Sequence, residues 1–207
     1  MITGFEICEI KPPASLGPFF DGKPPRIWGV GEPTILDGRL LGIISARQID
    51  SDLASKSSEL LKTLPSLREV AFIGGWHSPL EEEALHILAA KTARIILCIP
   101  KALNRFLPSD DIANRVTQRQ VLLLTHCSPK AKRISRNASI RRNQLVVGLA
   151  NALLVLSAPA GSVSLKLAIS ALRRGKPVLT PEQHMNKELL ECGALPATFD
   201  NVQAALR

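Results

Sequence analysis

The sequence contains few cysteines and no recognisable metal-binding spacing. Its cysteines form no C-x-x-C pair, and its four histidines show no regular spacing to them. Structural zinc sites place these ligands at short, fixed intervals, so the pattern argues against a bound metal. Cys98 lies inside the apolar run Ile95–Ile99, where a buried thiol is expected. We expect no metal and no other cofactor.

Long apolar runs are also missing. No uninterrupted stretch of about 18 apolar residues occurs, which argues against a membrane span. The N-terminus carries Glu6 and Glu9 and has no basic flank leading into an apolar run, so it does not have the pattern of a secretory signal peptide. We therefore expect a cytoplasmic protein that does not bind membranes.

Catalytic motifs are absent as well. The sequence has no Walker A motif, no G-x-S-x-G elbow and no glycine-rich dinucleotide fingerprint after its first core strand. His77 and Ser78 are neighbours before a helix, a placement that does not by itself give nucleophile-to-base geometry. The acidic run Glu81–Glu83 is typical of a solvated first helical turn, which complements the helix dipole. We find no catalytic residues and predict no enzyme.

Short apolar runs alternate with amphipathic stretches from Leu41 onward. Strands that are apolar throughout, alternating with helices, indicate a parallel sheet covered on both faces. We predict an α/β fold with a doubly wound, mostly parallel Rossmann-type sheet. The predicted strands are Leu41–Ala46, Val70–Gly74, Arg94–Ile99, Gln120–Thr125, Ala152–Ser157 and Pro177–Thr180. The predicted helices follow Ala46 and Gly75 and also cover Ser139–Ala150, Ser162–Arg173 and Lys187–Cys192.

The first forty residues are rich in proline, and Ile27–Val30 has the pattern of a short strand. Phe19, Phe20 and Trp28 need a place to be buried. We predict a short N-terminal extension, residues 1–38, packed on the sheet of a Rossmann-type domain, residues 39–207.

Three strand-to-helix loops have the composition of phosphate-binding turns. Ligands of open parallel sheets bind beyond the carboxyl ends of the strands, where helix N-termini offer free amides to phosphates. The candidate residues of the first loop are Ser45, Ala46 and Arg47. Those of the second are Gly74, Gly75, His77 and Ser78. Those of the third are Gly161, Ser162 and Ser164.

Positive charge is concentrated next to these loops. The net charge is +8, and the stretch from Ser128 to Gln144 contains no acidic residue. Cations are unfavourable at a helix N-terminus, so an anionic partner explains this run better than the helix does. The run contains Lys130, Lys132, Arg133, Arg136, Arg141 and Arg142. Lys101 and Arg105 are predicted on the same edge, where Trp76 and Phe106 could stack on bases.

Several of these motifs resemble the DprA/Smf family of DNA-processing proteins. The resemblance extends from Pro24 to Ala194, and its most specific part is Arg142–Ala150 (RNQLVVGLA). The other similar segments are Arg26–Gly31, Leu41–Arg47, Ile73–Gly75, Pro100–Pro108, Ala158–Leu165, Gly175–Val178 and Leu189–Ala194.

The resemblance implies an extended Rossmann fold that binds single-stranded DNA, often as a dimer, and works with a RecA-type recombinase. It also implies that Arg47 and Arg142 hold phosphates. Asn143 would order the loop or contact the strand, and Gly161 to Ser164 would line the pocket.

Two other functions stay open at this point. One is a sensor domain that binds a small nucleotide through the same loops. The other is an enzyme similar to the nucleotide phosphoribohydrolases of the lysine-decarboxylase-like family. Leu167 stands where that family has its glutamate, so the acid needed for the chemistry is absent.

Overall fold

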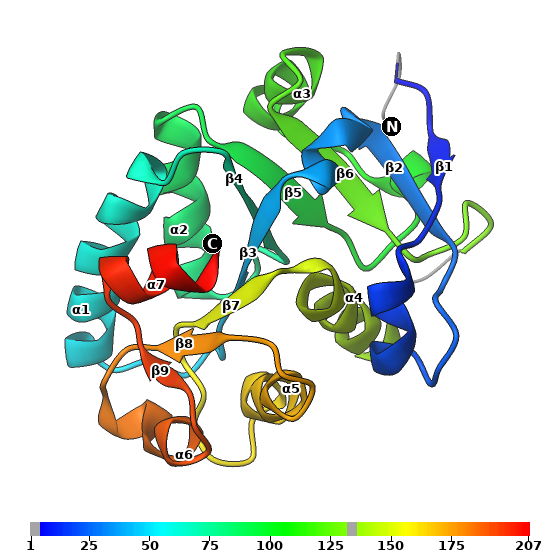
Figure 1. The fold of residues 1–207 in the computed structure, drawn as a ribbon. Coiled ribbons are helices and arrows are strands. Elements are labelled where there is room, and N and C mark those ends of the chain that lie inside the picture. The colour runs from blue at the N-terminus through cyan, green and yellow to red at the C-terminus, as the bar shows by residue number, and fades with distance from the viewer. Residues whose placement is uncertain (1–4, 132–135) are drawn as a thin grey trace.

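A computed structural model describes residues 5–131 and 136–207 of the chain. Its strands form one sheet in the order β1-β2-β6-β5-β4-β3-β7-β8-β9 (Figure 1). Neighbouring strands from β6 through to β9 pair in parallel, whereas β2 is antiparallel to both β1 and β6. The strands are β1 (Cys8–Ile10), β2 (Ile27–Gly31), β3 (Arg39–Ile44), β4 (Val70–Gly74), β5 (Arg94–Cys98), β6 (Val121–Thr125), β7 (Ala152–Val155), β8 (Val178–Thr180) and β9 (Leu195–Pro196).

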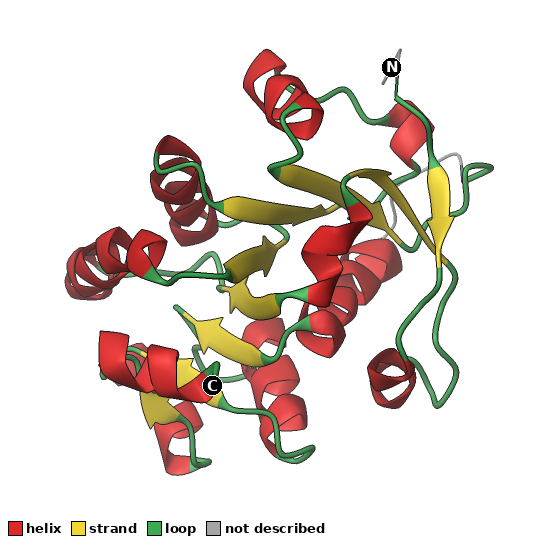
Figure 2. Cartoon of the chain, turned by 45° about the horizontal axis from the view of Figure 1, so that its top comes forward, coloured by secondary structure: helices red, strands yellow, loops and turns green. Residues whose placement is uncertain are grey.

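Helices cover both faces of the sheet (Figure 2). One face packs against α4, α5 and α6, and the other against α1, α2, α3 and α7. The helices are α1 (Ser51–Thr63), α2 (Pro79–Ala90), α3 (Asp110–Thr117), α4 (Arg136–Leu149), α5 (Val163–Leu172), α6 (Lys187–Glu191) and α7 (Phe199–Ala205). The predicted doubly wound fold is confirmed.

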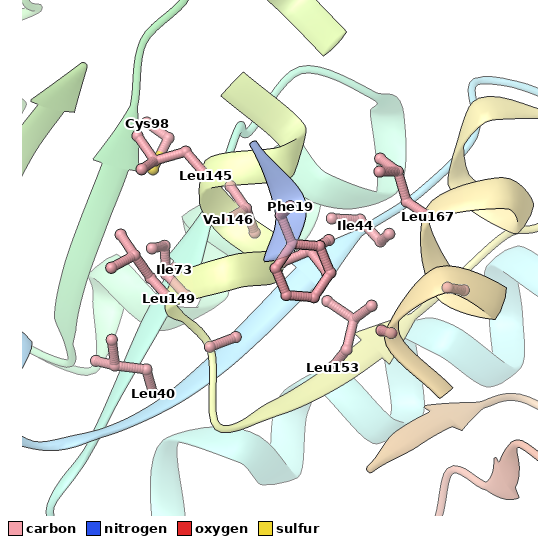
Figure 3. Packing of buried hydrophobic residues seen from close by; sticks show 14 of the residues in the cluster. Phe19, Leu40, Ile44, Ile73, Cys98, Leu145, Val146, Leu149, Leu153 and Leu167 are labelled. Atoms are coloured by element: carbon pink, nitrogen blue, oxygen red, sulfur yellow. The ribbon is translucent and has the colours of Figure 1, made fainter. Parts of the chain in front are cut away.

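The central strands are apolar throughout because both of their faces are buried. In β3, Leu40 and Ile44 belong to the core on the α4 side, while Leu41 and Ile43 belong to the core on the α1 side. This alternation follows from the two-residue repeat of a strand. Figure 3 shows part of the first core, in which Leu145 of α4 lies beside Cys98 of β5 and Leu167 of α5 lies on the opposite side.

The N-terminal segment adds strands to the sheet and a short helix to the layer that packs on one of its faces. β1 and β2 extend the sheet beyond β6, and the 3-10 helix η1 (Ala14–Phe19) packs on α4. Phe19 and Phe20 are buried there, as the sequence predicts. The division of the chain at residue 38 stays a prediction.

Some boundaries differ from the predicted ones. The first core strand ends at Ile44, so Ser45 and Ala46 belong to the following loop. The helices α3 and α7 are not predicted from the sequence, although Ser109 and Thr198 cap their N-termini in the ordinary way. No helix in the described residues is long and apolar enough to cross a membrane.

Candidate functional site

The candidate site is a cavity of about 380 Å³ at the carboxyl ends of β3 and β4. From β3 the chain adds β4, β5 and β6 on one side, and then returns to place β7 on the other side of β3. Doubly wound sheets bind ligands at such a switch point, where the loops diverge. The cavity is lined by Ile44, Ser45, Ala46, Arg47, His77, Ser78, Glu81, Ser139, Ile140, Arg142, Asn143, Val163 and Ser164.

Arg142 of α4 places a buried positive charge in the wall of this cavity. The residue is only 5% exposed. One guanidinium nitrogen donates a hydrogen bond to the Gly75 carbonyl at 3.1 Å, but Nε has no partner among the described residues. Burial lowers the pKa of Arg142, and the nearby Glu81 carboxylate opposes that shift. A buried cation with unsatisfied donors is unfavourable, so the site favours an added anion.

Gly75 makes room for this guanidinium group. A Cβ atom at position 75 would lie 2.4 Å from a terminal nitrogen of Arg142 and 2.7 Å from its Nε. Such contacts are shorter than van der Waals packing allows, so any larger residue would displace the Arg142 side chain. The absence of a side chain at Gly75 therefore fixes where the charge lies.

Glu81 of α2 joins two of the predicted loops beneath the cavity. Its carboxylate accepts hydrogen bonds from the Ser45 amide and from the His77 amide, both at 2.8 Å. The residue is 5% exposed, and burial raises the pKa of its carboxyl group while these amides oppose the shift. The prediction of a solvated turn is therefore wrong for Glu81. This carboxylate holds the loop after β3 against the loop after β4.

Arg47 and His77 form a pair at the mouth of the cavity. A terminal guanidinium nitrogen of Arg47 lies 2.7 Å from Nε2 of His77. Because arginine only donates, this ring nitrogen must accept, so the imidazole is neutral with its proton on Nδ1. Partial burial and the charges of Arg142 and Arg47 lower the pKa of His77. The histidine therefore becomes easier to protonate when an anion offsets those charges.

The loop after β7 is held by serine hydroxyls. Ser162 caps α5 by accepting a hydrogen bond from the Leu165 amide at 3.1 Å. The Ser164 hydroxyl donates to the Ser157 carbonyl at 2.9 Å. Gly161 has a φ of +74°, a left-handed conformation that favours glycine. These contacts fix the N-terminus of α5 at the cavity wall.

The cavity brings together many of the predicted site residues. Those that line it are Ser45, Ala46, Arg47, His77, Ser78, Arg142, Asn143 and Ser164. Gly75, Gly161 and Ser162 shape the surrounding loops. Val163 also lines it, as the resemblance implied for Gly161 to Ser164, whereas Ile44, Glu81, Ser139 and Ile140 were not predicted as site residues.

Other predicted residues lie outside the cavity lining. Lys101 follows β5, with its Nζ 5.2 Å from the centre of the Phe106 ring, and Arg105 ends the short 3-10 helix that comes next. The guanidinium carbon of Arg141 lies 5.1 Å from the centre of the Phe20 ring. Arg133 lies outside the described residues.

Trp76 is not available for stacking on bases, so that prediction is wrong. The residue is buried, and its indole Nε1 donates to the Ile96 carbonyl at 3.0 Å. A Cβ atom on Gly74 would lie 2.8 Å from the indole ring. Gly74 therefore serves the packing of Trp76 and does not itself contact the cavity.

Comparison with known proteins identifies one family. A family model described as DNA recombination-mediator protein A matches residues 12–196. A search of the curated proteins finds no significant match.

Solved structures with the same fold come from several bacteria. DNA processing protein A from Streptococcus pneumoniae is 17% identical, with a TM-score of 0.79 over 99% of this chain and 75% of the other. DNA processing protein A from Helicobacter pylori, described for its single-stranded DNA binding mode, is 20% identical, with a TM-score of 0.75 over 99% and 96%. A molybdenum cofactor binding protein from Rippkaea orientalis is 16% identical, with a TM-score of 0.54 over 80% and 93%. At these identities the likeness shows the fold.

Replacing Gly75 by alanine tests the geometry of the site. The new methyl carbon would lie 2.4 Å from a terminal nitrogen of Arg142. It must therefore push the guanidinium group away from the carbonyl of residue 75. We expect a shifted Arg142 Nε–H resonance and a loss of roughly 1–2 kcal/mol in the free energy of unfolding, measured by urea denaturation. Gly38→Ala is the matched control, since its Cβ would have no neighbour closer than 3.7 Å. An unchanged Arg142 resonance in Gly75→Ala would contradict this description.

Proposed function

The chain belongs to the DNA recombination-mediator protein A family, and from this membership we propose that it binds single-stranded DNA at the cavity between α4 and α5, as part of DNA processing and recombination. The proposal rests on the buried guanidinium group of Arg142. A backbone phosphate supplies the anion that this group lacks, through charge-assisted hydrogen bonds.

Other groups around the cavity support a phosphate ligand. Arg47 stands at the mouth and can bind a phosphate with two parallel hydrogen bonds. The first amides of α5 have no acceptor within their own helix, and a helix N-terminus favours an anion. Val163 and Ser164, from that first turn, line the cavity. A phosphate held here would therefore meet donors from both the mouth and the wall.

The lining also has an apolar part that fits the rest of a nucleotide. Ile44, Ile140 and Val163 contribute aliphatic surface, and Val163 is 41% exposed. Aliphatic side chains can pack on a sugar or a base without selecting a sequence. We propose that Lys101, Arg105 and Arg141 guide the neighbouring nucleotides along the same edge of the sheet. Arg133, predicted for the same role, lies outside the described residues.

We propose binding without catalysis. Glu81 is the one carboxylate among the described residues that line the cavity, and both of its oxygens accept backbone amides. A carboxylate held in this way is poorly placed to remove a proton from a substrate. A RecA-type recombinase partner, a homodimer and a cytoplasmic location stay predictions from the sequence.

The substitution Arg142→Ala tests the proposed function. We expect it to weaken the binding of a labelled single-stranded oligonucleotide by about 1–3 kcal/mol, because it removes a charge-assisted contact. The slope of log Kd against log salt should also fall by about 0.7, as for one lost phosphate contact. Arg141→Ala, one residue away, is the comparison. Its guanidinium lies over Phe20 and outside the cavity, so the loss should be smaller.

Two results would count against the proposal. One is an Arg142→Ala variant that binds the oligonucleotide as tightly as the wild type. The other is tight binding of a mononucleotide with oligonucleotide binding that is undetectable or insensitive to salt. The second result would favour a nucleotide sensor.

DNA binding should also depend on pH through His77. A bound phosphate offsets the charges of Arg47 and Arg142 that lower the pKa of His77, so binding raises that pKa and takes up a proton. Affinity should increase as pH falls from about 8 to about 5.5, roughly tenfold for each unit by which the pKa of His77 rises. Fluorescence anisotropy across this range measures the effect. The control His77→Gln should show a flatter profile, and an equally steep one would show that His77 is not the group that titrates.

A further inference from the structure

A second group of positive charges lies at the amino-terminal edge of the sheet, opposite the cavity described above. Arg39 begins β3 and Arg94 begins β5, while Arg68 lies just before β4 and Arg207 just after α7. Arg39, Arg68 and Arg207 line one cavity of about 290 Å³. Arg39 and Arg94 line a neighbouring cavity of about 490 Å³. We call these four residues the amino-edge arginines.

The amino-edge arginines have no partner that neutralises them. Across residues 5–131 and 136–207, none of their guanidinium groups makes an ion pair or a side-chain hydrogen bond. Asp37 and Glu69 line the larger of the two cavities, but neither carboxylate is within ion-pair distance of an arginine there. Among the side chains that line these two cavities there are therefore four positive charges and two negative ones.

Helix dipoles explain only part of this arrangement. The C-termini of α1 and α7 point to this edge, and a cation near a helix C-terminus is favourable. However, Lys62 already occupies the last turn of α1, and Arg39 and Arg94 belong to strands. The last carbonyls of α7, at Gln203 and Ala204, accept hydrogen bonds from the Leu206 and Arg207 amides. The gathering of several arginines around shared cavities is better explained by an anionic ligand.

The shape of the group favours a polyanion over a single phosphate. Arg39 begins β3 and Arg94 begins β5, and β4 lies between these two strands. Because neighbouring strands lie about 4.8 Å apart, the backbones of Arg39 and Arg94 are about 10 Å from each other. A ligand with repeated charges can contact such a row at several points. No aromatic side chain is among the described residues that line either cavity, so bases have nothing to stack on. The aliphatic residues of the smaller cavity, Leu67, Val70 and Leu206, are at most 7% exposed and offer a base little surface. Contact through backbone phosphates is therefore the main mode of binding.

We propose that the amino-edge arginines form a second binding site for single-stranded DNA, which lets one chain hold two strands at once. The ligand class rests on the function proposed above, but the site is separate from the Arg142 cavity. Arg39 and Ile44 mark the two ends of β3, about 17 Å apart through the core of the protein. A short strand at one edge cannot reach the other without passing around the helices that cover the sheet.

The test counts short oligonucleotides bound per chain. Native mass spectrometry and calorimetry with tetrathymidylate should give two per chain for the wild type. The double variant Arg39→Gln, Arg68→Gln should bind one oligonucleotide per chain. Its affinity at the amino-edge arginines should fall by more than about tenfold, while the Arg142 cavity should keep the wild-type affinity. Arg142→Ala should lose the other site instead.

A matched control removes two charges from the same edge without touching the cavities. Lys91 and Arg173 cap the C-termini of α2 and α5, and neither lines the cavities of the amino-edge arginines. The double variant Lys91→Gln, Arg173→Gln should still bind two oligonucleotides. Circular dichroism shows whether each variant keeps its fold, which is expected for the two double variants because their substituted side chains are exposed.

The outcomes separate this proposal from the proposed function. If the wild type binds one oligonucleotide per chain and Arg142→Ala loses it, the second site is wrong while the proposed function stands. Two oligonucleotides bound to Arg39→Gln, Arg68→Gln would also overturn the second site. If the wild type binds none, both proposals are wrong.

Discussion

The position of one buried positive charge determines how the carboxyl edge of the sheet is built. Moving an arginine out of water costs several kcal/mol unless other groups compensate. Here the compensation is partial, because the Gly75 carbonyl accepts one hydrogen bond and Glu81 contributes a negative charge nearby. The Nε donor is left without a partner among the described residues. The fold thus maintains a site whose electrostatic balance is completed by an anion from outside.

The neighbouring groups differ in how firmly they are held. Glu81 fixes the amides of Ser45 and His77, and Ser162 and Ser164 fix the start of α5. The cavity wall is therefore formed before a ligand arrives, which reduces the ordering cost of binding. Arg47 and His77, by contrast, are exposed at the mouth. They can exchange their mutual hydrogen bond for contacts with a phosphate.

The strands of this fold were predictable because a parallel sheet buried on both faces produces apolar runs. The predicted bounds of Val70–Gly74 are those observed for β4. The helix α3 was missed because it spans eight residues, although Ser109 before Asp110 and Asp111 is an ordinary start signal. The pairing of β2 with β6 joins segments more than ninety residues apart, and no local pattern reveals it.

The site was harder to predict than the fold, and two residues show why. Ser78 followed three positions later by Glu81 matches a capping box, which would have suggested a glutamate bound to backbone amides. It could not have shown that the second amide comes from Ser45, on a different loop. Arg142 precedes Leu145, Val146 and Leu149 by three, four and seven residues, a spacing that places it on the buried face of α4. Its contact with Gly75 depends on tertiary packing alone.

A structure of the chain bound to a short single-stranded oligonucleotide would show directly whether an outside anion completes the site at Arg142. We expect a backbone phosphate in the cavity, with an oxygen within hydrogen-bond distance of the Arg142 guanidinium and the Gly75 contact retained. An oligonucleotide bound elsewhere, with no anion at Arg142, would contradict it.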